Sequence, residues 1–172
     1  LIISDPRKQL VYLYASAGTI SSTYGGVATH AQFTPDNQTV YISMGTPDAN
    51  GNVVPNNQLL VHSNFTGWTL TTLGAPASDV AITVPSVGTY LAGSPTTARS
   101  YCASTTITGT PPNVTSITNE FYPLADSATI ATDRIVATND GLHILGATAA
   151  GGSSIVDLGF TPPGLPPPPG AG

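Results

Sequence analysis

The sequence predicts an all-β protein, and three observations lead to this prediction. Gly and Pro number 18 and 16 among the 172 residues, so they interrupt every long window in which a helix could form. β-branched residues dominate the segments between them, and no stretch keeps apolar residues at a 3.6-residue period for three turns. Short apolar segments bounded by turn residues are therefore expected to be strands. The expected strands are Leu10–Ser16, Thr29–Thr34, Thr39–Met44, Gln58–Ser63, Trp68–Leu73, Val80–Val84, Thr89–Ala92, Ser100–Thr106, Ser116–Phe121, Thr129–Thr132, Arg134–Thr138, Leu142–Leu145 and Ser154–Leu158.

A phrase of two apolar strands around a turn occurs three times. The copies are Ala31–Ser43, Val80–Ala92 and the more degenerate Ala128–Ala137. Aligning their second strands at Val40, Thr89 and Ile135 gives successive offsets of 49 and 46 residues. A period of about 40 to 50 residues with strands in each unit is typical of β-propeller blades.

The first complete unit reads as a four-stranded antiparallel meander. Its strands are His30–Thr34, Thr39–Met44, Gln58–Ser63 and Trp68–Leu73, with a long loop between the second and the third. The last unit keeps Gly141–Gly146 as its third strand and Ser154–Leu158 as its fourth. The segment Leu1–Pro6 reads as a strand running into a turn, so we expect the chain to begin in the middle of a longer protein or after processing.

Three segments carry a family resemblance: Val40-Tyr-Ile-Ser43, Leu59-Leu-Val-His62, and the Leu73-Gly-Ala-Pro76 connection into the next unit. Over residues 1–160 the chain resembles bacterial surface β-propellers with YVTN-type repeats and the related lactonase-like propellers. The resemblance implies a radial array of four-stranded antiparallel blades, of which this chain would hold three to four. The chain departs from the family pattern in its short first unit and in a third unit that lacks the Pro-x-x-Gly turn. Propellers carry four to eight blades, so the array would belong to a longer propeller or close by pairing with another copy. A β-sandwich is the alternative fold.

The chain divides at residue 160. Residues 161–172 contain six prolines and should form a polyproline II linker or tail, because proline cannot join a sheet. Residues 1–160 form the single repeat domain.

The composition excludes several classes of partner. Only four Lys and Arg residues are present, and they are scattered, so no basic patch for nucleic acid is expected. No apolar run approaches the roughly 20 residues that span a bilayer, so we expect no membrane insertion. Charged residues make up 8% of the chain, while Ser and Thr supply 40 residues. This composition favours a secreted, cell-surface or envelope protein.

Metal and modification sites have weak signals. Asp48, Asn50 and Asn52 resemble the opening oxygen ligands of a calcium loop, but the acidic ligand expected near Leu59 is missing, which favours a polar hairpin loop. The histidines, His30, His62 and His143, show no metal-ligand spacing, and we expect no cofactor. Three sequons make glycosylation sites possible, about as many as chance predicts. They lie at Asn37, Asn64 and Asn113.

Catalytic groups are equally hard to assign. Asp79 and Asp126 each precede a predicted first strand and would approach a central channel, although capping of a turn is the simpler interpretation. No catalytic site is evident. We interpret the chain as an extracellular or envelope-associated structural and interaction scaffold, binding a protein, a second copy of itself or carbohydrate. A lactonase-like hydrolase and a β-sandwich adhesin are the alternatives.

Overall fold

A computed structural model describes the backbone of residues 1–15, 18–34, 37–73, 76–84, 89–94, 99–108, 116–123, 134–138, 144–147 and 155–157. Side chains are described for residues 1–15, 18–34, 37–73, 76–82, 134–138 and 145–147. Within these ranges the chain forms strands, turns and bends and no helix, which confirms the all-β prediction.

In these described ranges fourteen strands form four antiparallel sheets, each built from strands that follow one another in the chain. The first sheet comprises β1 (Ile2–Asp5), β2 (Leu10–Tyr14) and β3 (Ile20–Gly25). The second comprises β4 (Val27–Phe33), β5 (Thr39–Pro47), β6 (Val53–Ser63) and β7 (Gly67–Thr72). The third comprises β8 (Asp79–Val84), β9 (Thr89–Ser94), β10 (Arg99–Thr108) and β11 (Ser116–Pro123). The fourth comprises β12 (Arg134–Ala137), β13 (Ile144–Ala147) and β14 (Ile155–Asp157).

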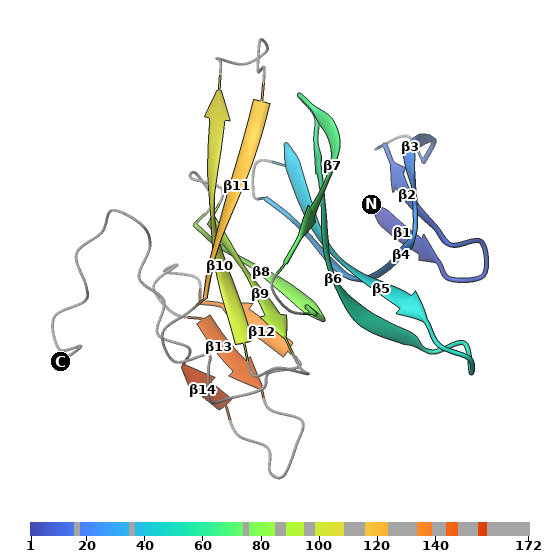
Figure 1. The fold of residues 1–172 in the computed structure, drawn as a ribbon. Coiled ribbons are helices and arrows are strands. Elements are labelled where there is room, and N and C mark those ends of the chain that lie inside the picture. Colours follow the sequence, from blue (N-terminus) through green and yellow to red (C-terminus); the bar gives the residue numbers. More distant parts are fainter. Residues whose placement is uncertain are drawn as a thin grey trace, which may run out of the picture.

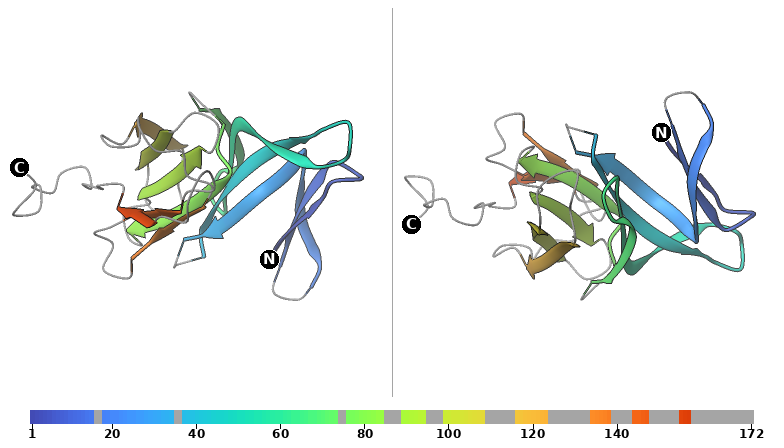
Figure 2. Two further views of the ribbon diagram at one scale, coloured as in Figure 1. Left: turned by 90° about the horizontal axis from the view of Figure 1, so that it is seen from below. Right: turned by 90° about the horizontal axis from the view of Figure 1, so that it is seen from above.

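The four sheets follow one another across the molecule in chain order, from the blue first sheet to the orange fourth sheet (Figure 1). Their first strands form a row in which β1 contacts β4, β4 contacts β8, and β8 contacts β12. Two further views show the first two sheets at one end of the molecule and the third and fourth sheets side by side at the other (Figure 2). The start of each meander therefore lies beside the start of the next.

The second sheet is covered on both faces, which explains the nearly continuous apolar run of β5. Val40, Ile42 and Met44 pack with Val11 of the first sheet. Tyr41, whose side chain alternates to the other face, packs in a separate cluster with Val80 of β8. A strand buried on both faces has no need of the apolar-polar alternation of a half-exposed strand.

The junction between the first two sheets also includes an indole. Trp68 on β7 packs against the apolar cluster that contains Val11 and Ile42, with its ring centroid 5.7 Å from that of Tyr24. Its Nε1–H donates a 2.7 Å hydrogen bond to Ser22 Oγ. Trp68 is therefore a packing residue of this junction.

Two features of the first and second sheets differ from the prediction. The strand β3 was missed, because its sequence Ile-Ser-Ser-Thr-Tyr-Gly has few apolar residues. The predicted long loop after Met44 is instead a continuation of the β5–β6 hairpin, with pairs from Gly45–Pro55 to Pro47–Val53 beyond a register shift. The hairpin accommodates Pro47 and Pro55 near its tip.

The third copy of the repeated phrase is placed differently from its predicted alignment. Val40 and Thr89 lie on second strands, whereas Ile135 lies on β12, which contacts β8 in the row of first strands. The two segments predicted as the third and fourth strands of that unit contain β13 and β14. In the described part of the chain these are the second and third strands of the fourth sheet. The predicted strand Thr129–Thr132 lies outside the described residues, as does the 161–172 tail.

In the part of the chain that is described, no helix has the length and apolar character required to cross a bilayer.

Candidate functional site

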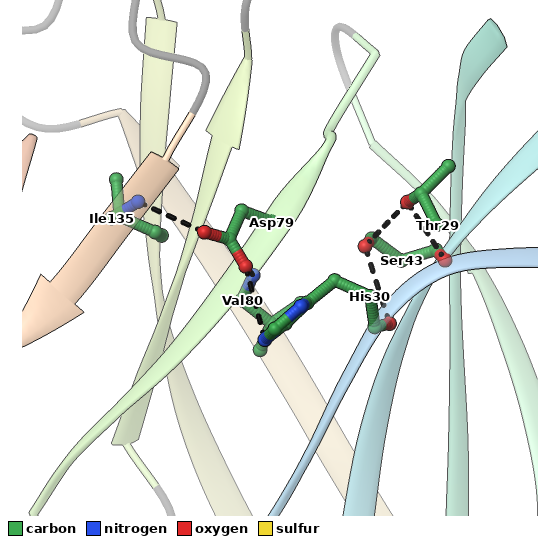
Figure 3. A network of polar contacts seen from close by, with 6 residues as sticks. All are labelled: Thr29, His30, Ser43, Asp79, Val80 and Ile135. Carbon is green, nitrogen blue, oxygen red and sulfur yellow. Dashed lines mark hydrogen bonds and ion pairs between the residues drawn. The ribbon is translucent and has the colours of Figure 1, made fainter. Parts of the chain in front are cut away.

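The carboxylate of Asp79, the first residue of β8, is a buried polar group with partners on two other strands. Its side chain is 4% exposed. Oδ1 accepts hydrogen bonds from the backbone N–H of Val80 at 2.9 Å and lies 3.1 Å from Nε2 of His30. Oδ2 accepts a hydrogen bond from the backbone N–H of Ile135 at 3.0 Å. Figure 3 shows the carboxylate between the ring of His30 and the start of β12.

These contacts join three sheets. His30 belongs to β4, Asp79 to β8 and Ile135 to β12, which are consecutive members of the row of first strands. Burying a carboxylate is costly unless donors replace the water that it loses. Two backbone N–H groups and an imidazole supply those donors, so the buried charge connects the sheets instead of destabilising them.

Two hydroxyl groups near His30 are engaged elsewhere. Thr29 Oγ1 and Ser43 Oγ lie 2.7 Å apart, and Thr29 Oγ1 also donates to the backbone carbonyl of Ser43 at 3.1 Å. Ser43 Oγ donates to the backbone carbonyl of His30 at 3.3 Å, not to its ring (Figure 3). This network fixes β4 against β5 and places no hydroxyl nucleophile on the imidazole.

The calcium-loop candidates lie in the turn of the β5–β6 hairpin. Asp48 Oδ1 accepts from the backbone N–H groups of Asn50 and Asn52, each at 2.8 Å, and Oδ2 lies 3.2 Å from Nδ2 of Asn52. Hydrogen bonds from the backbone and side chain of Asn52 and from the Asn50 and Gly51 amides lower the pKa of Asp48 despite some desolvation. The geometry is that of an Asx turn, in which the carboxylate binds amides.

His62 lies on β6, the third strand of its meander, as predicted. Its ring contacts that of Trp68 edge-on, with centroids 4.5 Å apart. Burial lowers the pKa of His62, because desolvation disfavours the charged imidazolium. His143 and Asp126 lie outside the described residues, and the side chain of Cys102 does as well.

Two of the three sequon asparagines lie in neighbouring turns at one end of the second sheet. Asn37 is exposed with φ of 57°, a left-handed conformation that asparagine tolerates. Asn64 is exposed, its Nδ2 donates to Gln38 Oε1 at 3.1 Å, and its backbone N–H donates to the Gln38 carbonyl at 3.0 Å. Asn113 lies outside the described residues. Their use as glycosylation sites stays a prediction.

Sequence reasoning selected Asp79 but did not find its partners. It placed His30 on a first strand and Asp79 before the next first strand. The pairing with His30 and the bond to Ile135, 56 residues further along the chain, depend on how the sheets are placed relative to one another. The sequence nevertheless contained a signal. An aspartate, Asp79, stands at the start of one first strand, and a histidine, His30, lies on the first strand of the preceding unit.

No group of three or more His, Cys, Asp or Glu side chains able to hold a metal ion occurs among the residues that the structure describes. A comparison of the sequence with models of known protein families finds no match, and neither does a comparison with characterised proteins.

Proposed function

We propose that the chain is a β-propeller-type array of blades that acts as a structural and interaction scaffold outside the cell. The observation that carries this proposal is the row of first strands joined by Asp79, with each four- or three-stranded meander leading outward from the row. A propeller places the first strand of each blade toward a common axis, so neighbouring first strands meet.

The burial pattern also favours an array over a sandwich. A β-sandwich has two layers, and each of its sheets has one face in the core and one in solvent. The second sheet here packs through Leu60 on one face and Leu59 on the other. A sheet between two neighbours is expected in the interior of a stack of blades.

The alternative as a hydrolase has less support. The half-exposed His30, paired with a buried acid, resembles two members of a catalytic triad. Such a site also requires a nucleophile within hydrogen-bond reach of the ring, and the hydroxyls of Thr29 and Ser43 are committed to each other and to backbone carbonyls. The pair is therefore better explained as a connection between blades.

Equilibrium unfolding of the chain tests the array. Trp68, the only tryptophan, reports on the junction of the first two sheets, while far-ultraviolet circular dichroism reports on all sheets. Sheets that share buried faces should unfold as one cooperative unit, giving coincident transitions. A separate unfolding transition of the first two sheets would contradict a continuous array.

The proposed location is tested through Lys8, the only lysine of the sequence, whose side chain is 68% exposed. A membrane-impermeant amine reagent applied to intact source cells should label Lys8, and mass spectrometry of the Lys8 peptide detects the label. Lys8→Arg is the matched control, because it keeps the charge and removes the reactive amine. Labelling that requires cell lysis would contradict an extracellular location.

A further inference from the structure

The strand β7 forms the outer edge of the second sheet. At the opposite edge, β4 lies in the row of first strands and contacts β1 and β8. In the described part of the chain β7 pairs with β6 alone. Both faces of this sheet are covered by neighbouring sheets of the same chain, so its outer edge is the side at which a further strand can be added.

The strand register shows which backbone groups lie on this edge. Leu73, directly after β7, donates its backbone N–H to the carbonyl of Asn57 on β6 at 2.7 Å. Backbone groups point to alternate sides along a strand, so those of Trp68, Leu70 and Thr72 point away from β6. The outer edge therefore presents a row of backbone donors and acceptors.

The strand β7 also lacks the features that protect the last strands of the other sheets. Charged residues, prolines, bulges and short length keep an edge strand from pairing with another chain. β11 contains Glu120 and Pro123, β14 has three residues, and the pairing of β3 with β2 is irregular between Leu13 and Tyr14. β7, with the sequence Gly-Trp-Thr-Leu-Thr-Thr, has no charge and no proline, and its register with β6 is unbroken. Such an edge is suited to pairing.

An exposed leucine lies in the middle of β7. Leu70 is 41% exposed, although it stands opposite the fully buried Leu60. Thr69 and Thr72 on the same strand are exposed as well. A strand added beside β7 would cover the outer side of Leu70. Burial of apolar surface would then add to the hydrogen bonds formed by the backbone.

The strand β7 is complementary to a second copy of itself in antiparallel orientation. When Leu70 stands opposite Leu70 of the other copy, Trp68 and Thr72 stand opposite each other on both sides of that pair. All three residues direct their backbone groups outward, so each pair can exchange both of its N–H···O hydrogen bonds. The two leucines meet on one face, and no like charges oppose each other because β7 carries none.

We propose that β7 pairs with β7 of a second copy of this chain about a two-fold axis at Leu70, so that two second sheets become one continuous sheet. This inference rests on the proposed function, since it names the partner of the scaffold. The contact uses the same strand of both copies, so assembly through it closes at a dimer and leaves neither β7 edge open.

The first test measures the mass of the intact chain by light scattering across a concentration series, with a reducing agent that keeps Cys102 from linking copies. Leu70→Lys places two like charges opposite each other at the axis, and we expect it to weaken dimerisation by at least about tenfold. Val54→Lys is the matched control, because Val54 is 46% exposed in the outer part of the β5–β6 hairpin. It should leave the dimer unchanged.

The folding of the variants is checked by circular dichroism. Should Leu70→Lys fail to fold, Leu70→Thr replaces it, because threonine suits an exposed strand position and removes most of the apolar contact at the axis. It should weaken the dimer in the same direction by a smaller factor.

A charge exchange tests the two-fold register. Leu70→Glu alone should weaken the dimer as Leu70→Lys does, because two carboxylates would then face each other. An equal mixture of the two variants should form the mixed dimer, in which lysine faces glutamate. Native mass spectrometry distinguishes the mixed dimer from either homodimer. A mixture that stays as monomeric as its components would overturn the pairing at Leu70.

A chain that stays monomeric at every concentration would overturn the inference, as would a dimer that Leu70→Lys does not weaken or that Val54→Lys weakens equally. These failures are distinguishable from failure of the proposed scaffold. A monomer can still unfold with coincident fluorescence and circular dichroism transitions, and separate transitions can occur in a chain that dimerises through β7.

Discussion

The second sheet has two junctions, and they are held together in different ways. Toward the first sheet the contact is mainly apolar, centred on Val11 and Ile42. Two hydrogen bonds also cross it, from Trp68 Nε1 to Ser22 Oγ and from the Ala28 backbone N–H to Ser4 Oγ. Toward the third sheet a comparable apolar cluster is joined by the buried carboxylate of Asp79. Apolar burial is non-directional and stabilises any close packing. Hydrogen bonds are directional, so Asp79 also fixes how β4, β8 and β12 are placed along one another.

The largest effects are expected from emptying either apolar cluster. Leu59 and Leu60 are neighbours on β6, are both fully buried, and face opposite junctions. Leu59→Ala and Leu60→Ala should each lower the free energy of unfolding by about 2–5 kcal/mol, measured by denaturant titration.

Trp68 emission separates the two variants. Leu60→Ala opens a space in the cluster against which Trp68 packs, so the native emission spectrum should shift. Leu59→Ala should leave that spectrum unchanged. The same shift in both variants would mean that the two junctions are not independent.

The next largest loss of stability is expected from substitution of Asp79. Asp79→Asn retains the shape of the side chain but replaces one acceptor with an NH₂ donor, so a donor on β4 or β12 loses its partner. We expect a loss of about 1–3 kcal/mol in the free energy of unfolding, as for other buried groups left without a partner. Asp48→Asn, in the exposed turn, is the control and should lower the free energy of unfolding less than Asp79→Asn does. Equal losses would contradict a special role for Asp79.

Removing the indole hydrogen bond should have a smaller effect. Ser22→Ala deletes the acceptor of Trp68 Nε1–H at a partly buried position, where water can partly replace it. The expected loss is about 0.5–1.5 kcal/mol, measured by thermal or denaturant unfolding. Ser21→Ala, at an exposed neighbouring position, should be nearly neutral. A neutral Ser22→Ala would show that this hydrogen bond does not stabilise the junction.

The pH dependence tests the His62–Trp68 contact. Because burial lowers the pKa of His62, the unfolded chain binds the proton more readily than the folded chain. The contribution of neutral His62 is therefore fully present above its ordinary pKa, near 6.5, and is lost as the pH falls through the lower folded-state pKa. Comparison of unfolding between about pH 7.5 and pH 5 should give a shallower decline for His62→Gln than for the unaltered chain. An unchanged slope would contradict the assignment.

The sequence predicted most strands because their apolar residues alternate or run continuously between turn residues. It missed β3, a hydroxyl-rich strand that buries one face only partly. It also missed the outer part of the β5–β6 hairpin, which it predicted as a long loop. Local patterns also misplaced Ile135, since β12 was identified by resemblance to second strands.

The candidate site was predictable only in part. Asp79 was selected because it precedes a predicted first strand and would approach a central channel. The simpler interpretation, that it caps a backbone amide, agrees with its hydrogen bond from Val80. Its other partners lie on strands of different sheets. Pairing within a sheet follows from neighbouring segments, whereas packing between sheets depends on twist and side-chain volume, for which the sequence carries no short-range signal.

Hydrogen exchange at the amide of Ile135 tests the connection between the first strands most directly. In the native chain this N–H donates to the buried Oδ2 of Asp79, so it should exchange slowly. In Asp79→Ala it should exchange at least about tenfold faster relative to the amide of Leu60, which lies in β6 away from the carboxylate. Rapid exchange of Ile135 in the native chain, or a rate that Asp79→Ala leaves unchanged, would contradict the row of first strands held by Asp79.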